Sequence, residues 1–494
     1  MQILIPLISS MYFVAAFFIF AFSMVQLSLI IYFLLQQRKK TAEPLPVPQD
    51  KLPTVTVQLP LYNERYVAKR LIDCVAQIDY PKHLLDIQVL DDSTDDTQQV
   101  VAERVDYWRQ QGINIEQILR PNRSGYKAGA LAYGLTKSTS EYVAIFDADF
   151  LPPTDFLRRT LSHFQNEWVG MVQTRWGHIN ESYSLLTKLQ AFGLNGHFII
   201  EQTGRNAAGS FINFNGTGGV WRRKCIEDAG GWSADTLTED LDLSFRAQMK
   251  GWRFHYLPEI VTPAELPVIM SAIKSQQYRW NKGGAETARK HLLSVLLHRA
   301  IPLQAKLHGF FHLISSSVFL GLFISTFLSV PILLLKETFP GLQFIMQVGA
   351  LFTGGFFSIG LLYWLSARHS GISGRPFYYL KTFPLFIALC MGLSLHNSIA
   401  VLEGWLGIKS PFVRTPKFNI QQQDESWAGN VYVRSALTPG ILIEGLLSIY
   451  FFTGFVLSIA LQEYLFSIFI FLPTLGFLVV FLYSLQGSKQ QLAA

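Results

Sequence analysis

The sequence has little charge and few cysteines for its length. Only 15% of its 494 residues are charged and 50% are hydrophobic, which is too apolar for a purely soluble enzyme. Its cysteines, Cys74, Cys225 and Cys390, are odd in number and lack metal-ligand spacing. They indicate core residues in a reducing compartment and exclude a disulfide framework. The sequence also contains no internal repeat and no low-complexity tract. Part of the chain is therefore predicted to face lipid.

A long uncharged run lies near the N-terminus. Met11 to Leu35 carries no charged side chain and is long enough to cross a hydrocarbon core of about 30 Å. Arg38, Lys39 and Lys40 follow it, so the positive-inside rule predicts an external N-terminus and a cytoplasmic chain from residue 40 onward. The run lacks a basic start and a small-residue cleavage site, which argues against a cleaved signal peptide.

Further apolar stretches follow residue 306. The middle one carries Lys381, His396, Asn397 and Glu403 and has basic residues on both sides. A spanning helix would export one of those basic flanks, so we predict an interfacial or re-entrant helix there. About five true spans and a cytoplasmic C-terminus result. The stretches are 307–335, 344–366, 379–404, 441–461 and 463–485.

The net charge of +6 does not indicate a nucleic-acid partner, because the basic residues concentrate beside apolar segments. Between Ser271 and Lys306, basic residues alternate with leucines and aromatics and Glu286 is the one acid. This pattern predicts amphipathic helices on an anionic lipid surface. The predicted organisation is a transmembrane helix (1–40), a cytoplasmic domain (41–268), interface helices (269–306) and a membrane domain with a loop at 405–440 (307–494).

The predicted domain 41–268 alternates strand-like and helix-like patterns. Strands are predicted at 54–59, 86–90, 142–146 and 170–174, with helical spacing between them. This alternation indicates an α/β domain, a mostly parallel sheet with helices on both faces. Ligands bind such sheets at the carboxyl ends of the strands. Polar clusters follow three predicted strands: Tyr62-Asn63-Glu64, Asp91-Asp92 and Asp147-Ala148-Asp149.

Two of these clusters have chemical interpretations. Mg²⁺ binds through one or two carboxylates plus substrate phosphates, which suits Asp147 and Asp149. The alternative is a turn with solvated acids. Ser93 to Asp95 could cap the following helix, but this does not explain the doubled acid before it. One of Asp91 and Asp92 is therefore predicted to accept hydrogen bonds from a base or ribose.

Two later motifs complete the predicted chemistry. Thr238-Glu239-Asp240 opens a helical pattern, so capping competes with catalysis. A carboxylate within reach of an acceptor hydroxyl can act as general base, and we assign that role to Asp240. Gln276 to Trp280 lies in the basic stretch, where Arg279 could meet lipid phosphate and Trp280 the membrane interface. In the functional interpretation, Arg279 binds a departing diphosphate and Trp280 the apolar face of a sugar.

Two glycine-containing segments are further candidates. Lys127, within Gly125 to Ala130, is a candidate phosphate ligand. The turn 211–219 contains Asn215, Gly216 and Thr217, and glycine permits close backbone approach to a ligand. We predict an acceptor-binding turn there, with an ordinary loop as the alternative.

Taken together, these motifs resemble those of family 2 membrane glycosyltransferases, the group of cellulose, hyaluronan and chitin synthases. The order D, DxD, TED and QxxRW matches Asp92 (or Asp91), Asp147/Asp149, Thr238 to Asp240 and Gln276 to Trp280. The segments 57–64, 88–95, 125–131 and 143–150 resemble the cellulose-synthase-like A group, the glucomannan mannosyltransferases. The resemblance implies a GT-A fold, an inverting mechanism and Mg²⁺ or Mn²⁺.

The complete set of predicted site residues has four groups. The catalytic residues are Asp240, Glu239 and Asp149, and the metal ligands are Asp147 and Asp149. The acceptor-binding residues are Trp280, Asn215, Gly216 and Thr217. The donor-binding residues are Pro60, Tyr62, Glu64, Asp91, Asp92, Lys127, Asp147, Gln276 and Arg279.

One more match to a family motif follows the apolar stretch 379–404. Phe412 to Lys417 resembles the FxVTxK gating loop of processive synthases, with Arg414 in place of the family's valine. The resemblance implies a loop that covers the active site from the cytoplasmic side.

The leading functional hypothesis is a processive β-glycan synthase that threads its product through its own membrane helices. A non-processive, ceramide-type lipid glycosyltransferase carries similar motifs and is the alternative. A catalytically silent nucleotide-sugar receptor is disfavoured by the intact carboxylates. The expected partners are a UDP- or GDP-hexose donor, a glycan or lipid acceptor and membrane lipids. The mannan-like resemblance favours GDP-mannose, whereas the wider family favours UDP-glucose or UDP-N-acetylglucosamine.

Overall fold

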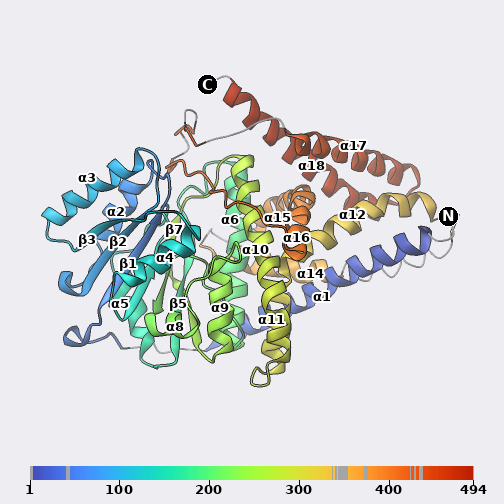
Figure 1. Ribbon diagram of the computed structural model, residues 1–494. Coiled ribbons are helices and arrows are strands. Elements are labelled where there is room, and N and C mark those ends of the chain that lie inside the picture. The colour runs from blue at the N-terminus through green and yellow to red at the C-terminus, as the bar shows by residue number, and fades with distance from the viewer. Residues whose placement is uncertain are drawn as a thin grey trace.

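The computed structural model describes residues 4–39, 45–336, 338–339, 342, 354–371, 376–422, 424–427, 430–432 and 438–492. Figure 1 shows a block built on a β-sheet at the left and a group of long apolar helices at the right. Helix α10 (Met270–Leu297) runs between them. The predicted boundary at residues 40 and 41, and parts of the predicted loop 405–440, lie outside the described residues.

The described chain contains a seven-stranded sheet in the order β3-β2-β1-β4-β6-β5-β7. Strand β6 runs antiparallel to β4 and β5, and the other pairings are parallel. The predicted α/β class with a mostly parallel sheet is confirmed. The four predicted strands correspond to β1, β2, β4 and β5, whereas β3, β6 and β7 were not predicted. The strands are β1 (Val55–Leu61), β2 (Leu85–Asp91), β3 (Ile115–Leu119), β4 (Tyr142–Ile145), β5 (Val169–His178), β6 (Gly219–Arg222) and β7 (Arg253–Ala264).

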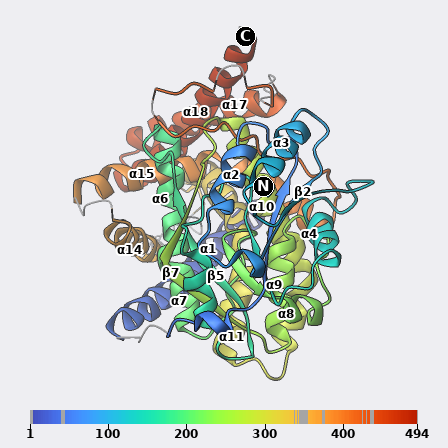
Figure 2. The ribbon, with the colours of Figure 1, turned by 90° about the vertical axis from the view of Figure 1, so that its left-hand side faces the viewer.

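Helices cover both faces of the sheet because its central strands are apolar on both sides. Val57 and Val89 pack in one core with Leu71, while Ile145 packs in the other with Leu131. Figure 2 views the block from its free side, with the apolar helices behind it. The α-helices of the block are α2 (Ala68–Ala76), α3 (Thr97–Gln110), α4 (Tyr126–Thr136), α5 (Phe156–Leu161), α6 (Leu185–Asn195), α7 (Gln202–Ala207), α8 (Arg223–Asp228) and α9 (Glu239–Met249).

Shorter elements connect these helices and strands. A π-helix, η4 (Gly196–Glu201), joins α6 to α7. The 3-10 helices are η1 (Gln49–Lys51), η2 (Lys82–Leu84), η3 (Ser162–Phe164) and η5 (Ser315–Ser317).

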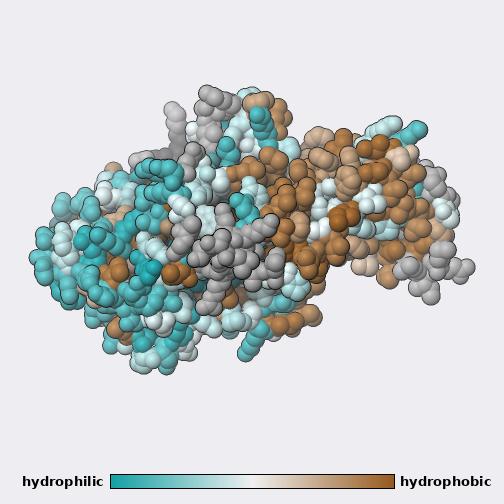
Figure 3. Space-filling view, turned by 90° about the horizontal axis from the view of Figure 1, so that it is seen from above, coloured by the Kyte–Doolittle hydropathy of each residue, from teal (hydrophilic) through white to brown (hydrophobic). Residues whose placement is uncertain are grey.

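The apolar helices make this a membrane protein. Among the described residues, four helices are long and apolar enough to cross a bilayer: Ile5–Arg38, Ser315–Leu335, Pro439–Ala460 and Tyr464–Gln486. Figure 3 shows hydrophobic side chains gathered over this end of the molecule and hydrophilic ones over the sheet block. The helices are α1 (Leu4–Arg38), α11 (Leu303–Leu313), α12 (Val318–Leu335), α14 (Gly354–His369), α15 (Pro376–Gly392), α16 (Ser394–Leu406), α17 (Pro439–Ala460) and α18 (Tyr464–Leu492).

The predicted membrane segments differ in detail from these helices. The stretch 307–335 is divided, because α11 ends at Leu313 and the candidate span begins at Ser315. Residues 344–353 of the stretch 344–366 lie outside the described residues. The stretch 379–404 forms two helices, α15 and α16, bent by 50°. A bent pair fits either a broken span or a re-entrant loop, so the interfacial interpretation stays a prediction.

Helix α10 is more buried than the predicted interface helix. The ammonium of Lys282 is enclosed by protein and lies 2.9 Å from the Glu403 carboxylate of α16. Lys274 pairs with Glu444 of α17 at 2.6 Å. Basic residues of the stretch predicted to lie on an anionic lipid surface thus hold α10 to the membrane helices, because a buried ammonium requires a carboxylate partner.

Candidate active site

A polar cavity lies at the carboxyl ends of β1, β2, β4 and β5. Helices α9 and α10 and the segment Phe412–Lys417, hereafter the 412–417 loop, close it. Most predicted site residues line this cavity, as expected where parallel strands end together. They are Pro60, Tyr62, Glu64, Asp92, Lys127, Asp147, Asp149, Asn215, Gly216, Glu239, Asp240, Gln276, Arg279 and Trp280.

Asp147 and Asp149 follow β4 and carry different partners. The Lys127 ammonium, from the first turn of α4, lies 2.6 Å from Asp147 and donates to the Gly216 carbonyl at 2.8 Å. Asp149 is buried and accepts from the Lys417 ammonium at 2.7 Å and from the Glu265 backbone N–H at 3.2 Å. The two carboxylates therefore face positive charge from both sides of the cavity.

The chemistry of this acid pair fits a hard divalent cation. One carboxylate oxygen of Asp149, Oδ1, is buried and has no hydrogen-bond partner among the described residues. No group of three or more His, Cys, Asp or Glu side chains in the described parts of the chain could hold a metal by itself. A cation here would take its other ligands from a diphosphate and water, as Mg²⁺ does in phosphate-handling sites.

Asp240 lies in the first turn of α9, opposite the acid pair. The Thr238 side chain does not cap α9 but lies 3.1 Å from the Thr287 hydroxyl, so the capping interpretation of this motif fails for its threonine. Gly216 has φ +80°, and a Cβ there would lie 3.0 Å from an Asp240 carboxylate oxygen and 3.3 Å from the Lys127 ammonium. A glycine therefore lets the turn pass beside both charged groups.

The environment of Asp240 favours a proton acceptor at neutral pH. Burial raises the pKa of Asp240 to about 7, the Glu239 carboxyl adds to the shift, and Lys127 opposes it. Burial likewise raises the pKa of Glu239. Two buried carboxyls side by side cannot both ionise easily, which keeps one of them poised to exchange a proton.

Aromatic and cationic side chains gather at the ends of β1 and β2. The Arg123 guanidinium lies 3.3 Å from the centre of the Tyr62 ring. Asp92 forms a two-point ion pair with Arg120. Asp91 does not line the cavity: it is buried and accepts from the Ser93 backbone N–H and the Gln117 amide, each at 2.9 Å. Of the predicted acid pair, Asp92 is thus the member that lines the cavity.

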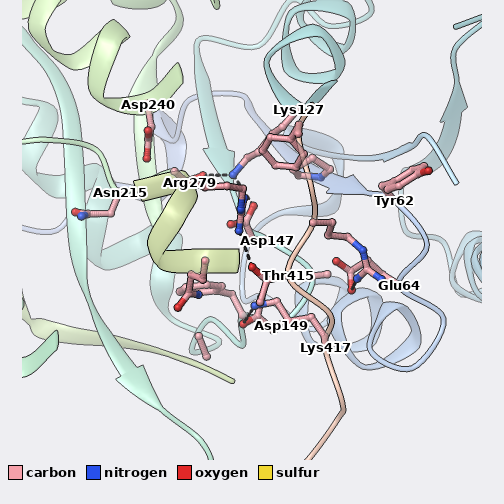
Figure 4. Close-up of a pocket in the computed structure, with 18 of the residues that line it drawn as sticks. Tyr62, Glu64, Lys127, Asp147, Asp149, Asn215, Asp240, Arg279, Thr415 and Lys417 are labelled. Atoms are coloured by element: carbon pink, nitrogen blue, oxygen red, sulfur yellow. Dashed lines mark hydrogen bonds and ion pairs between the residues drawn. The ribbon is translucent and has the colours of Figure 1, made fainter. Parts of the chain in front are cut away.

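The 412–417 loop contacts side chains from several elements that line the cavity. The Thr415 hydroxyl accepts from Arg279 at 2.8 Å, and the Arg279 guanidinium lies 4.8 Å from the centre of the Phe412 ring. Arg414, the residue that departs from the gating-loop pattern, lies 2.6 Å from the Glu64 carboxylate. In Figure 4 the loop runs beside Asp147 and Asp149, between Arg279 and Glu64. The loop and the catalytic block therefore lie on one side of any membrane.

The predicted acceptor turn is fixed by hydrogen bonds to residues of neighbouring segments. Asn215 accepts from the Gln202 amide at 2.8 Å and lies 3.2 Å from His197 of the π-helix. Thr217 does not line the cavity, and its hydroxyl accepts from the Asp147 backbone N–H at 2.9 Å. Figure 4 shows Asn215 and Asp240 at one end of the cavity and Tyr62 and Glu64 at the other.

Several lining residues escaped the sequence analysis. They come from the end of a strand and from loops, at positions that carry no motif, and spacing alone does not reveal them. A weak signal was available for Arg123, which lies two residues before the glycine that starts the Lys127 motif. The missed residues include Arg123, Trp176, His178 and Glu265.

Comparison with known proteins identifies a family to which part of this chain is similar. Residues 53–283 match the model of glycosyltransferase-like family 2. This region is therefore similar to a family 2 glycosyltransferase domain. The domain contains every motif discussed above except the 412–417 loop.

Individual relatives are similar over about half of the chain. Glucomannan 4-beta-mannosyltransferase 1 of Oryza sativa subsp. japonica is 40% identical over 281 residues, which cover 55% of this chain and 54% of that protein. Glucomannan 4-beta-mannosyltransferase 2 of Arabidopsis thaliana is 42% identical over 261 residues, covering 52% of this chain and 49% of that protein. The chain thus spans about half the length of these curated relatives.

One solved structure shares the fold. A mannosyltransferase from Pyrobaculum calidifontis, solved in complex with GDP-Man and Mn²⁺, superposes with a TM-score of 0.51 at 20% identity. The match covers 81% of this chain and 100% of that one. The predicted GT-A-like fold of the sheet block is confirmed.

Proposed function

We propose that this protein is an inverting hexosyltransferase that extends a β-linked glycan from a nucleotide sugar and passes the product into its membrane helices. The observation that carries this proposal is the placement of Asp240. Its carboxylate lies in a cavity that also presents two acids and three cations, Asp147, Asp149, Lys127, Arg279 and Lys417, for a diphosphate. A poised base beside a diphosphate site is what direct displacement at an anomeric carbon requires.

The proposed reaction uses the residues as follows. An acceptor hydroxyl oxygen attacks the anomeric carbon as its proton passes to the Asp240 carboxylate. The bond from the anomeric carbon to the diphosphate oxygen breaks, and the electron pair leaves with the nucleoside diphosphate. Arg279 and Lys127 stabilise the charge that develops on that oxygen. Further charge would be neutralised by Mg²⁺ or Mn²⁺ held by Asp147 and Asp149.

We propose GDP-mannose as the donor. The named relatives are glucomannan 4-beta-mannosyltransferases, and the structural neighbour is a mannosyltransferase that binds GDP-Man with Mn²⁺. Isothermal calorimetry on the purified protein with Mn²⁺ tests this choice. GDP-mannose should bind at least tenfold more tightly than UDP-glucose or UDP-N-acetylglucosamine, a difference of about 1.4 kcal/mol. Equal or reversed affinities would refute the donor assignment.

We also propose that the catalytic domain is cytoplasmic and that synthesis is processive. The basic residues after α1 support this orientation, and the 412–417 loop lies over the cavity as a gate would. In this topology α15 and α16 stay on the cytoplasmic side, and the turn between α17 and α18 is external. The lipid-transferring alternative would not need a gate of this kind.

Cysteine labelling tests the orientation. In a background without Cys74, Cys225 and Cys390, a cysteine at Val413, which is 57% exposed, should react with an impermeant thiol reagent only after cells are permeabilised. A cysteine at Leu461, in the α17–α18 turn, should react in intact cells and is the matched control. Labelling at 413 in intact cells would place the loop outside and contradict the topology.

The pH dependence of transfer tests the state of Asp240. A base must be ionised to accept a proton, and burial raises the pKa of Asp240 to about 7. Glu239, Lys127 and Arg279 are the charged groups facing it. We therefore expect kcat/KM to rise with pH between about 6 and 8.

A second carboxyl needs a control in that experiment. Burial also raises the pKa of Glu64 to about 7, so ionisation of Glu64 could produce the same rise of kcat/KM with pH, hereafter the rising limb. The rising limb should persist in Glu64→Gln. A flat pH profile in the wild type would contradict a base with a raised pKa. Loss of the rising limb in Glu64→Gln would assign the rise to Glu64 and exclude Asp240 as its source.

A further inference from the structure

The order of strands arranges the ligands of the cavity along one edge of the sheet. Tyr62 and Asp92 follow β1 and β2, and Asp147 and Asp149 follow β4. On the far side of β4 come β6 and then β5. Neighbouring strands are about 4.8 Å apart, so β5 lies roughly 10 Å from β4. If a nucleoside lies at β1 and β2 and the diphosphate at β4, the end of β5 faces the sugars.

Trp176 and His178 occupy that end of β5. They are two residues apart in a strand, so they point to the same side, and both line the cavity. The Trp176 ring stacks on Phe198 at 4.9 Å and meets Phe150 edge-on at 5.1 Å. Its centre is 6.5 Å from that of Trp280, so the two indoles form adjoining walls.

Both side chains have unused hydrogen-bonding groups. The Trp176 indole N–H and the His178 Nε2 atom are buried and have no partner among the described residues. Burial, with a contribution from Arg175 and a smaller opposing one from Asn195, lowers the pKa of His178 to about 4. His178 is therefore neutral at physiological pH, and its ring can offer a donor or an acceptor. Leaving such groups unpaired is unfavourable.

We propose that Trp176 and His178 form, together with Trp280, a binding position for a sugar unit of the acceptor glycan. A pyranose ring presents an apolar C–H face and a rim of hydroxyls. Trp176 supplies an aromatic surface for the face, and the indole N–H and His178 supply partners for the hydroxyls. The inference rests on the proposed function and adds acceptor-binding residues that lie outside the sequence motifs.

The surroundings favour an acceptor sugar over the donor sugar. Leu194 of α6 also lines the cavity, and the next residue, Asn195, interacts with His178. Helix α6 packs on the membrane helices, where Phe192 contacts Tyr363 of α14 at 5.1 Å and Phe386 of α15 at 5.5 Å. This part of the cavity thus faces the side on which a growing glycan would reach the membrane, away from Tyr62 and Asp92.

The test compares Trp176→Ala, Trp176→Phe and His178→Asn in the purified full-length protein. The probes are β-1,4-manno-oligosaccharides of two to five units as acceptors and GDP-mannose as donor. We expect Trp176→Ala to raise the acceptor KM roughly tenfold and Trp176→Phe and His178→Asn to raise it about threefold, since an aromatic surface and a single hydrogen bond contribute unequally. The donor affinity should stay within about twofold. Trp168→Ala, at an exposed tryptophan, is the matched control.

Each outcome has one meaning. An unchanged acceptor KM in all three variants would overturn the inference, and so would a rise in donor Kd as large as the rise in acceptor KM. If Trp176→Ala does not fold, Trp176→Phe and His178→Asn decide the question by themselves. Failure of the wild-type protein to bind or hydrolyse any nucleotide sugar would refute the proposed function instead.

Discussion

Asp240→Asn is expected to abolish sugar transfer while the protein still folds and binds its donor. The amide has nearly the size of the carboxylate but cannot accept the proton of an attacking hydroxyl. Asp240 lies beside Gly216, where a Cβ would come within 3.0 Å of its carboxylate, so the isosteric change avoids a clash. Loss of general-base catalysis lowers rates roughly 10²- to 10⁴-fold. The measurement is the initial rate of label transfer from the donor, alongside donor affinity by calorimetry.

The control is Asp235→Asn, which changes an acid in the loop before the same helix. Asp235 forms a half-exposed ion pair with Lys290 at 2.7 Å, and its loss should leave the rate nearly unchanged because exposed pairs contribute little. A rate for Asp240→Asn within threefold of the wild type would remove Asp240 as the base. A large loss in Asp235→Asn would indicate that the helix start, not the carboxylate, is what matters.

Removal of divalent cations is expected to weaken donor binding strongly. Asp147 and Asp149 are flanked by Lys127 and Lys417, and a diphosphate near two carboxylates requires a cation between them. We expect EDTA, or Asp149→Ala with Mn²⁺ present, to lower the affinity for GDP-mannose about tenfold or more, as loss of one charge-assisted contact does. Calorimetry with and without chelator measures this.

The matched control for that substitution is Asp155→Ala, since Asp155 forms an exposed pair with Arg159 at 3.6 Å. Its donor affinity should equal that of the wild type. Equal affinity of the wild type in EDTA and in Mn²⁺ would show that the acid pair does not work through a metal.

Some strands could be predicted from the sequence because they are short apolar runs. The others lacked that pattern for identifiable reasons. Strand β7 contains Pro258 and Pro263. The sheet tolerates these prolines because β7 is an edge strand. Strand β6 has four residues and begins at the last glycine of the 211–219 turn. Strand β3 mixes isoleucines with Glu116 and Gln117. None of the three has a residue pattern that marks a strand.

The features of the site likewise fall into those that the sequence predicts and those that it does not. The carboxylates of β4 and α9 were found because motifs recur at strand and helix ends, where parallel topology brings them together. Lys417 approaches Asp149 from 268 residues away in the sequence, and Trp176 meets Trp280 only when β5 and α10 are packed. The gating-loop resemblance predicts that the 412–417 loop covers the site, but the individual contacts depend on tertiary structure and have no local signal. The burial of Lys282 against Glu403 was missed for the same reason.

The most direct test of the whole account is the product that the purified protein makes from each labelled donor. The full chain in lipid vesicles is supplied with GDP-mannose, GDP-glucose, UDP-glucose or UDP-N-acetylglucosamine and Mn²⁺, with Asp240→Asn as the blank. We predict that GDP-mannose alone suffices to give a long polymer that endo-β-mannanase degrades. Label found only in the lipid extract, or no label from any of these donors, would contradict it.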